Sequence, residues 1–127
     1  MNVPTDLQKL LGKKRHKYGA KSTPCRWGHK HPSIAEANHC FVLHSELNAG
    51  HITSLVYEYP FELIVNDKLI CVHKPDFYYK RACRNASGTA FWWDSCVDEV
   101  KGFRTSDWII KSKLFQALFP GIKYRVL

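Results

Sequence analysis

The sequence lacks the features that carry a chain into or across a membrane. No apolar run among its 127 residues approaches the roughly 20 residues needed to span a bilayer. Residues 1–6 also lack the charged-then-apolar order of a signal peptide. We therefore expect a cytoplasmic protein, in the reducing compartment where it is made, with no membrane partner.

A disulfide framework is missing as well. The cysteines are odd in number and irregularly spaced, which predicts no disulfides: Cys25, Cys40, Cys71, Cys83 and Cys96. A zinc site could be assembled from six residues: Cys25, His29, His31, His39, Cys40 and His44. Because no standard pair such as Cys-x2-Cys occurs, we do not expect structural zinc. The alternative is small buried cysteines and surface histidines.

Acidic residues are absent between Leu7 and Ala35, in a chain of net charge +8. Such a basic block predicts contact with a polyanion such as nucleic acid. The basic residues that we expect to contact DNA are Lys13, Lys14, Arg15, Lys17 and Lys21. The alternative is a solvated arm that only keeps the protein in solution, while an anionic membrane fits less well because the block has no regular apolar face. We divide the chain into a basic N-terminal arm, residues 1–32, and one globular domain, residues 33–127.

The domain opens with a helix signal. Ser33 and Glu36 form a capping box and Gly50 supplies a C-terminal cap, which predicts a helix over about 33–49. Two strips on this helix are expected to face the core, which makes the buried face wide. The first is Glu36, Cys40, Leu43 and Leu47, and the second is Ile34, Ala37 and Phe41.

Three strand-like runs follow, over 52–65, 68–79 and 91–101. The pair Asn66-Asp67 predicts a tight turn between the first two runs, and 80–90 reads as a basic loop. After Gly102, Thr105 caps a second helix that ends near Phe119, and 122–127 alternates as a final strand. Its apolar row is Ile110, Leu114 and Leu118, with Lys111 and Lys113 off the row. The order α-β-β-β-α-β predicts one mixed α/β fold.

Charged residues interrupt these apolar runs. Asp76 ends one run, while Glu99 and Lys101 lie two residues apart in the next and so share a face. Because burying an unpaired charge is costly, this arrangement indicates a divalent metal held by Asp76, Glu99 and the carbonyl of Val100. Lys101 could orient an attacking water or neutralise a phosphate oxygen. Asp98 should face the other side. The alternative is a same-face ion pair on a sheet surface.

Pro75-Asp76, followed 23 residues later by Glu99-Val100-Lys101 within this order of elements, resembles the PD-(D/E)XK nuclease superfamily. The resemblance implies a restriction-endonuclease-like core, in which helices flank a mixed central sheet. Further stretches are similar to small phage-encoded members: residues 17–21, 33–36, 59–63, 99–102 and 113–115.

The resemblance implies a Mg²⁺- or Mn²⁺-dependent endonuclease that hydrolyses phosphodiester bonds in DNA. Asp76 and Glu99 would be metal ligands, Lys101 the catalytic lysine, and Glu36 a further ligand. The alternative for Glu36 is that it only completes the capping box. Lys111 and Lys113 would contact DNA phosphates, or else lie on a solvated face.

A phage-derived enzyme of DNA recombination, cutting branched DNA such as a Holliday junction, would be a homodimer. A function of a different class is a non-catalytic nucleic-acid-binding module, with or without a stabilising zinc. In such a module the acids and the lysine would be structural.

Overall fold

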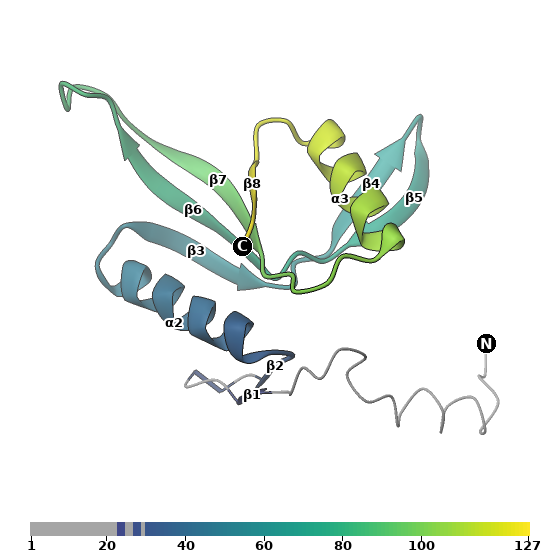
Figure 1. Cartoon of the computed structure of the whole chain (residues 1–127). Helices are drawn as coiled ribbons and strands as arrows, with labels where there is room; N and C mark the ends of the chain where they lie inside the picture. The colour runs from purple at the N-terminus through teal and green to yellow at the C-terminus, as the bar shows by residue number, and fades with distance from the viewer. Residues whose placement is uncertain (1–22, 25–26, 29) are drawn as a thin grey trace.

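The computed structural model describes residues 23–24, 27–28 and 30–127, and the DNA contacts expected at Lys13, Lys14, Arg15, Lys17 and Lys21 lie outside them. The elements are β1 (Thr23–Pro24), β2 (Lys30–His31), α2 (Ile34–Asn48), β3 (Ile52–Tyr57), β4 (Phe61–Val65), β5 (Lys68–His73), β6 (Phe77–Arg84), β7 (Phe91–Glu99), α3 (Ser106–Leu118) and β8 (Lys123–Val126) (Figure 1). None of the described helices is long and apolar enough to cross a membrane.

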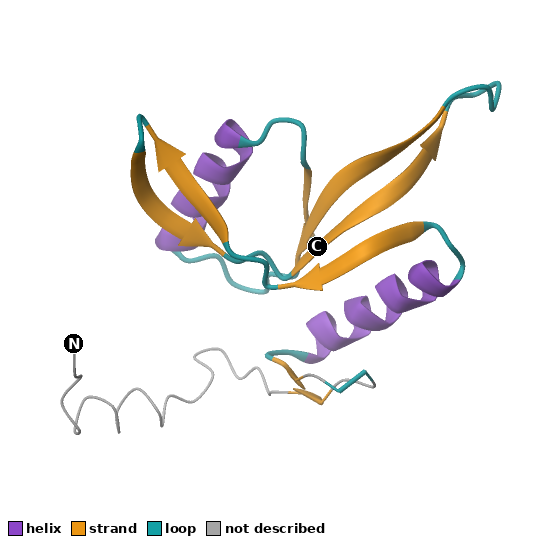
Figure 2. Cartoon of the chain, turned by 180° about the vertical axis from the view of Figure 1, so that it is seen from behind, coloured by secondary structure: helices purple, strands orange, loops and turns teal. Residues whose placement is uncertain are grey.

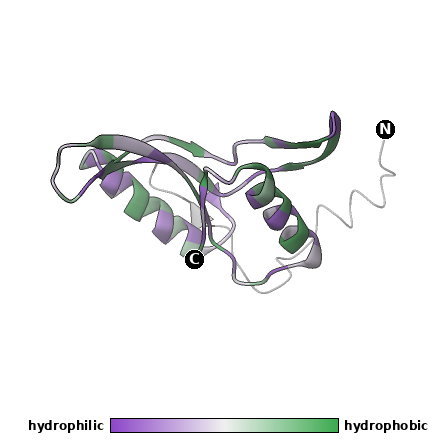
Figure 3. Ribbon diagram, turned by 90° about the horizontal axis from the view of Figure 1, so that it is seen from above, coloured by the Kyte–Doolittle hydropathy of each residue, from purple (hydrophilic) through white to green (hydrophobic). Residues whose placement is uncertain are grey.

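A four-stranded mixed sheet organises the fold, which confirms the mixed α/β class. Its order is β3-β6-β7-β8, with β8 parallel to β7 and the other neighbours antiparallel. The helix α2 packs on one face, where Cys40 and Leu43 meet Phe77 and Tyr79. On the other face, Phe115 of α3 packs with residues of β4, β7 and β8. The two helices therefore lie apart, and each carries both apolar and polar surface (Figure 3).

The capping signals of both helices are confirmed. Ser33 Oγ accepts a hydrogen bond from the Glu36 backbone at 3.1 Å, and Gly50 follows α2 with a φ of +79°. Thr105 Oγ1 likewise accepts from the Trp108 backbone at 3.2 Å. Short-range hydrogen bonds fix these ends, so local sequence is enough to find them.

The faces of the helices were predicted less well. The strip of Glu36, Cys40 and Leu43 is buried as expected. However, Ile34, Phe41 and Ile110 are exposed, so the second strip of α2 and part of the apolar row of α3 were wrong. Each helix contacts the rest of the described chain along one narrow stripe, and on α3 that stripe includes the buried Ser112 and Phe115.

The two long strands expected at 52–65 and 68–79 were wrong. Glu58 has a φ of 51° and ends β3, and the second run breaks at Pro75, which has no backbone N–H to donate. The hairpin β4–β5 between these breaks forms its own two-stranded sheet. This sheet lies apart from the main sheet, with α3 beside it (Figure 2). Its tight turn is confirmed, since Asn66 and Asp67 have φ values of 50° and 63°.

The basic loop expected at 80–90 was also partly wrong. β6 continues to Arg84, and β7 begins at Phe91, so only residues 85–90 form the connection. Arg84 and Phe91 pair directly across the two strands. The β6–β7 pair is therefore a long hairpin that reaches beyond α2 (Figure 1).

Candidate functional site

The residues predicted from the charged interruptions lie where the main sheet meets the β4–β5 hairpin. Glu36 is in the first turn of α2, Asp76 comes directly before β6, and Glu99 is the last residue of β7. Lys101 follows two residues later. Glu36, Asp76 and Glu99 are far apart in sequence, yet the fold links Asp76 to both other acids and to Lys101 through electrostatic interactions. Strand and helix ends converge in this region (Figure 2).

Glu36 and Asp76 form a pair of carboxyl groups in hydrogen-bonding contact. Burial, followed by the charge of Asp76, raises the pKa of Glu36 to about 8. Burial and then the charge of Glu99 also raise the pKa of Asp76. Asp76 Oδ2 in addition accepts a hydrogen bond from the Val100 backbone N–H at 2.8 Å. The raised pKa favours the protonated form of Glu36 at neutral pH.

Glu99 is only 1% exposed and has a different set of neighbours. Trp108 Nε1 donates to its Oε2 at 3.3 Å, and Lys101 Nζ lies 3.7 Å from the same oxygen. On the other side, His73 Nε2 lies 3.4 Å from Oε1 and 3.2 Å from the Tyr124 hydroxyl. Burial and then the charge of Glu99 raise the pKa of Tyr124, so that hydroxyl stays protonated.

Two buried carboxylate oxygens are left without a hydrogen bond from the described residues: Glu36 Oε2 and Glu99 Oε1. Each lies near a histidine, Glu36 Oε2 being 3.3 Å from His31 Nδ1, but without hydrogen-bond geometry. Such unsatisfied oxygens are costly unless a cation or a donor meets them.

These donors suit a hard divalent cation, since Mg²⁺ and Mn²⁺ prefer carboxylate and carbonyl oxygens. However, among residues 23–24, 27–28 and 30–127 no three His, Cys, Asp or Glu side chains are already grouped as metal ligands. The chemistry of the donor set therefore fits such an ion, but the side chains would have to move to close around it. The expected roles of Asp76, Glu99, Glu36 and the Val100 carbonyl as ligands stay predictions.

The lysines differ in how they meet solvent. The Lys101 side chain is partly exposed, and its Nζ lies 5.7 Å from the centroid of the Trp108 ring. Its ammonium therefore lies near both the Glu99 carboxylate and the Trp108 ring, and solvent reaches part of the side chain. On α3, Lys113 is exposed and Lys111 is half-buried. Their contact with DNA also stays a prediction.

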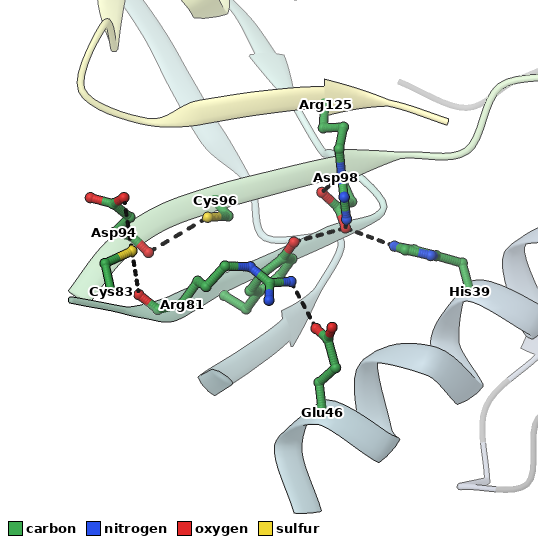
Figure 4. A network of polar contacts seen from close by, with 9 residues as sticks. His39, Glu46, Arg81, Cys83, Asp94, Cys96, Asp98 and Arg125 are labelled. Carbon is green, nitrogen blue, oxygen red and sulfur yellow. Dashed lines mark hydrogen bonds and ion pairs between the residues drawn. The ribbon is translucent and has the colours of Figure 1, made fainter. Parts of the chain in front are cut away.

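Asp98 lies on the opposite face of β7, as expected, and its partners are complete (Figure 4). Its Oδ2 lies 2.7 Å from His39 Nε2 and accepts from the Tyr79 hydroxyl at 2.9 Å. Arg125 donates to both oxygens, at 3.1 and 2.8 Å. Burial alone would raise the pKa of Asp98, but these hydrogen bonds lower it below the usual value. They hold Asp98 as a structural anion.

Sequence reasoning missed four neighbours of the site: His31, His73, Trp108 and Tyr124. A signal existed only for His73, a polar residue that ends an apolar strand. The described members of the possible zinc set have separate partners: His31 meets Glu36, His39 meets Asp98, and His44 and Cys40 both meet Tyr57. Cys25 and His29 lie outside the described residues.

Comparison with known proteins adds no relative. No family model matches the chain, and neither the curated proteins nor the solved structures give a significant match.

Proposed function

We propose that this chain is a metal-dependent endonuclease that hydrolyses phosphodiester bonds in DNA. One observation carries the proposal: Asp76 interacts electrostatically with both Glu36 and Glu99, and the ammonium of Lys101 lies 3.7 Å from Glu99 Oε2, where separate elements join. Two of these groups are buried and keep an oxygen without a hydrogen bond in the described chain. A purely structural ion pair would not need three acids for one lysine.

The arrangement of elements supports a restriction-endonuclease-like core. α2 precedes the sheet, and α3 connects β7 to the parallel strand β8. Asp76 comes directly before β6 and Glu99 ends β7, the antiparallel neighbour of β6, so the Pro-Asp and Glu-x-Lys patterns lie at adjacent strand ends. The β4–β5 hairpin would be an insertion between the first two strands of that core.

Asp76, Glu99 and Glu36, with the Val100 carbonyl, would hold Mg²⁺ or Mn²⁺. A bound ion of this kind lowers the pKa of its water and stabilises negative charge on the phosphoryl group. The chain itself positions the ligands. The Val100 N–H fixes Asp76 and the Trp108 indole N–H fixes Oε2 of Glu99, while His73 Nε2 lies 3.4 Å from Oε1.

Lys101 supplies a positive charge at the open side of this cluster. Its ammonium would neutralise a phosphate oxygen of the substrate or orient the attacking water. Glu36 carries a proton at neutral pH and would release it when a cation enters the cluster, because a nearby positive charge lowers a carboxyl pKa.

The finer proposals concern the substrate. We infer from the resemblance that the enzyme is phage-derived and cuts branched DNA, with a role in recombination. Paired incisions in a four-way junction require two sites, so this form of the proposal includes a homodimer. A monomer on sizing would contradict the resolvase form without contradicting endonuclease activity.

The experiment compares linear, flapped and four-way-junction DNA incubated with Mn²⁺, with Mg²⁺ or with EDTA. The wild-type protein should cut only with metal. Asp76→Asn keeps an acceptor for the Val100 N–H but removes the charge, so it should cut slower by roughly 100-fold or more. The exposed Glu62→Gln on β4 is the control and should cut normally.

Robust cutting by Asp76→Asn, or cutting in EDTA, would overturn the proposal. Salt-sensitive DNA binding with no cutting under any metal condition would instead favour the non-catalytic binding module.

A further inference from the structure

The outer half of the β6–β7 hairpin carries exposed aromatic side chains that the site does not use. Phe91 and Trp93 are 52% and 42% exposed, although aromatic residues of this size usually bury their rings. Their ring centroids are 5.4 Å apart and nearly perpendicular. This part of the hairpin extends past the end of α2 (Figure 1).

These aromatics lie on the same sheet face as the candidate site. Side chains two residues apart in a strand share a face, so Phe91 and Trp93 align with Val97 and Glu99. Val97 is covered by Phe115 of α3, but the described residues leave Phe91 and Trp93 uncovered. From Trp93 to Glu99 the distance along β7 is roughly 20 Å, at about 3.4 Å per residue.

Basic groups surround the aromatics. A hollow of about 600 Å³ is lined by Ala49, Gly50, His51, Arg81, Ala82, Arg84, Phe91 and Trp93. No acidic residue of the described chain lines it, but the Arg81 guanidinium is paired with Glu46 at 2.7 Å, so Arg84 carries the positive charge that faces the rings. Arg84 pairs with Phe91 across the strands, and its guanidinium lies 5.6 Å from the Phe91 ring centroid. We call the exposed set His51, Arg84, Phe91 and Trp93 the aromatic strip.

We propose that the aromatic strip binds a single-stranded segment of DNA and guides it toward Glu99 and Lys101. Bases stack on exposed aromatic rings, while arginine binds the phosphates between them. The inference rests on the proposed function for the choice of DNA as the ligand. It adds to that function a preference for substrates that offer unpaired nucleotides, such as flaps or open junctions.

The charge of the hollow decides against a second copy of this chain as its occupant. A symmetric contact would bring the same basic surface against itself, which is unfavourable without an intervening anion. A polyanion with flat apolar bases instead complements both Arg84 and the rings.

The opposite face of the hairpin offers a matched control. Trp92 is 43% exposed, as Trp93 is, but its Nε1 donates to Asp94 at 3.1 Å on the α2 face of β7. The two tryptophans therefore differ mainly in the face that they occupy. If exposed tryptophans bound DNA non-specifically, Trp92→Ala and Trp93→Ala would lose the same amount of affinity.

The test measures fluorescence anisotropy of a labelled oligo(dT) of about 12 nucleotides, a length within the range of known single-strand sites. EDTA is present throughout, so cutting cannot contribute. Trp93→Ala should weaken binding roughly 5- to 150-fold, whereas Trp92→Ala should leave it unchanged. Arg84→Ala should reduce the slope of log affinity against log salt by about 0.7. Circular dichroism should show that each variant is folded.

Equal losses in Trp93→Ala and Trp92→Ala, no loss in Trp93→Ala, or a blunt duplex bound as tightly as oligo(dT) would each overturn the proposal. Glu62→Gln, the exposed control on β4, should bind oligo(dT) as the wild type does. A protein that binds the oligonucleotide through Trp93 but never cuts would refute the endonuclease while leaving the aromatic strip intact.

Discussion

Two adjacent acids on β7, Asp98 and Glu99, have opposite surroundings. Asp98 receives hydrogen bonds from Arg125 and Tyr79 and contacts His39, so both of its oxygens are satisfied. Glu99 is equally buried, yet its Oε1 has no hydrogen bond from the described residues and two further carboxyl groups lie nearby. A residue whose partners are complete has little left with which to bind a ligand.

The difference shows that the partners of a buried acid distinguish a structural residue from a candidate metal ligand. On the α2 face, cations and donors outnumber the acid and lower the pKa of Asp98. Around Asp76, burial first and then the neighbouring carboxyl groups raise the pKa of Glu36 and Asp76. The first arrangement stabilises the fold, and the second stores unfavourable charge that a cation would relieve.

The largest expected effect on the stability of the metal-free protein follows from removing Asp98 from its hydrogen-bond partners. Asp98→Ala should lower the free energy of unfolding by about 2 kcal/mol, because the Tyr79 hydroxyl and His39 lose a buried acceptor, while the half-exposed Arg125 can be hydrated. Glu99→Gln should change it by about 1 kcal/mol or less, since the amide oxygen still accepts from Trp108. Urea unfolding of both variants measures the difference. A greater loss in Glu99→Gln would reverse the assignment of roles.

The next effect is on metal binding, which should depend on Asp76 and Glu99 but not on an acid of the α2 face. At a Mn²⁺ concentration of 100 times its Kd, the wild-type protein should gain about 2.7 kcal/mol of stability. Asp76→Asn and Glu99→Gln should lose this gain. Asp94→Asn is the control, because Asp94 pairs with Lys123 on the α2 face. Thermal unfolding with and without Mn²⁺ makes the measurement, and a gain retained by Glu99→Gln would contradict the metal site.

Sequence alone could locate the parts of this fold that depend on short-range hydrogen bonds. The caps at Ser33 and Thr105 and the turn at Asn66-Asp67 are of this kind. It could not detect that Glu58 and Pro75 would divide the long strands, because the flanking residues favour strand on both sides. The detached hairpin follows from these breaks and from packing against α3.

The same limit applies to the candidate site. The apolar runs flag Asp76, Glu99 and Lys101 because charge is unusual there. Trp108 carries no such signal, since its contact with Glu99 depends on the position that α3 takes against the sheet. Likewise, the exposure of Ile110 is decided by which side of α3 meets the hairpin, which no periodicity specifies when both sides contain apolar residues.

The pH dependence of stability should have opposite signs for the two groups of acids. The folded-state pKa of Glu36 is raised from 4.5 to about 8, so its proton stabilises the fold at low pH. This contribution is lost as the pH rises from about 4.5 to about 8, by at most roughly 1.4 kcal/mol per pH unit. For Asp98, whose pKa is lowered, stability is instead lost as the pH falls below its ordinary 3.8.

Urea unfolding across this pH range, with Glu36→Gln and Asp98→Asn beside the wild type, separates the two effects. Glu36→Gln should flatten the decline between pH 4.5 and 8 and leave the acid limb unchanged. Asp98→Asn should do the reverse. Parallel curves for the wild type and Glu36→Gln would mean that Glu36 is not protonated in the folded protein.

The smallest effect concerns DNA contacts outside the acids. Lys113→Ala should lower the salt dependence of duplex binding by about 0.9 in the slope of log affinity against log salt, the contribution of one phosphate contact. Lys123→Ala should leave the slope unchanged, because Lys123 lies beside Asp94 on the α2 face. Equal slopes for the wild type and Lys113→Ala would place Lys113 on a solvated face.

The most direct test of the central claim is the rate at which Glu99→Gln cuts DNA in Mn²⁺, measured on the preparation whose unfolding free energy has been determined. If Glu99 serves as a metal ligand and not as a structural residue, the free energy of unfolding of the variant should lie within about 1 kcal/mol of the wild-type value. It should cut slower by roughly 100-fold or more. A stable Glu99→Gln protein that cuts at the wild-type rate would contradict the account.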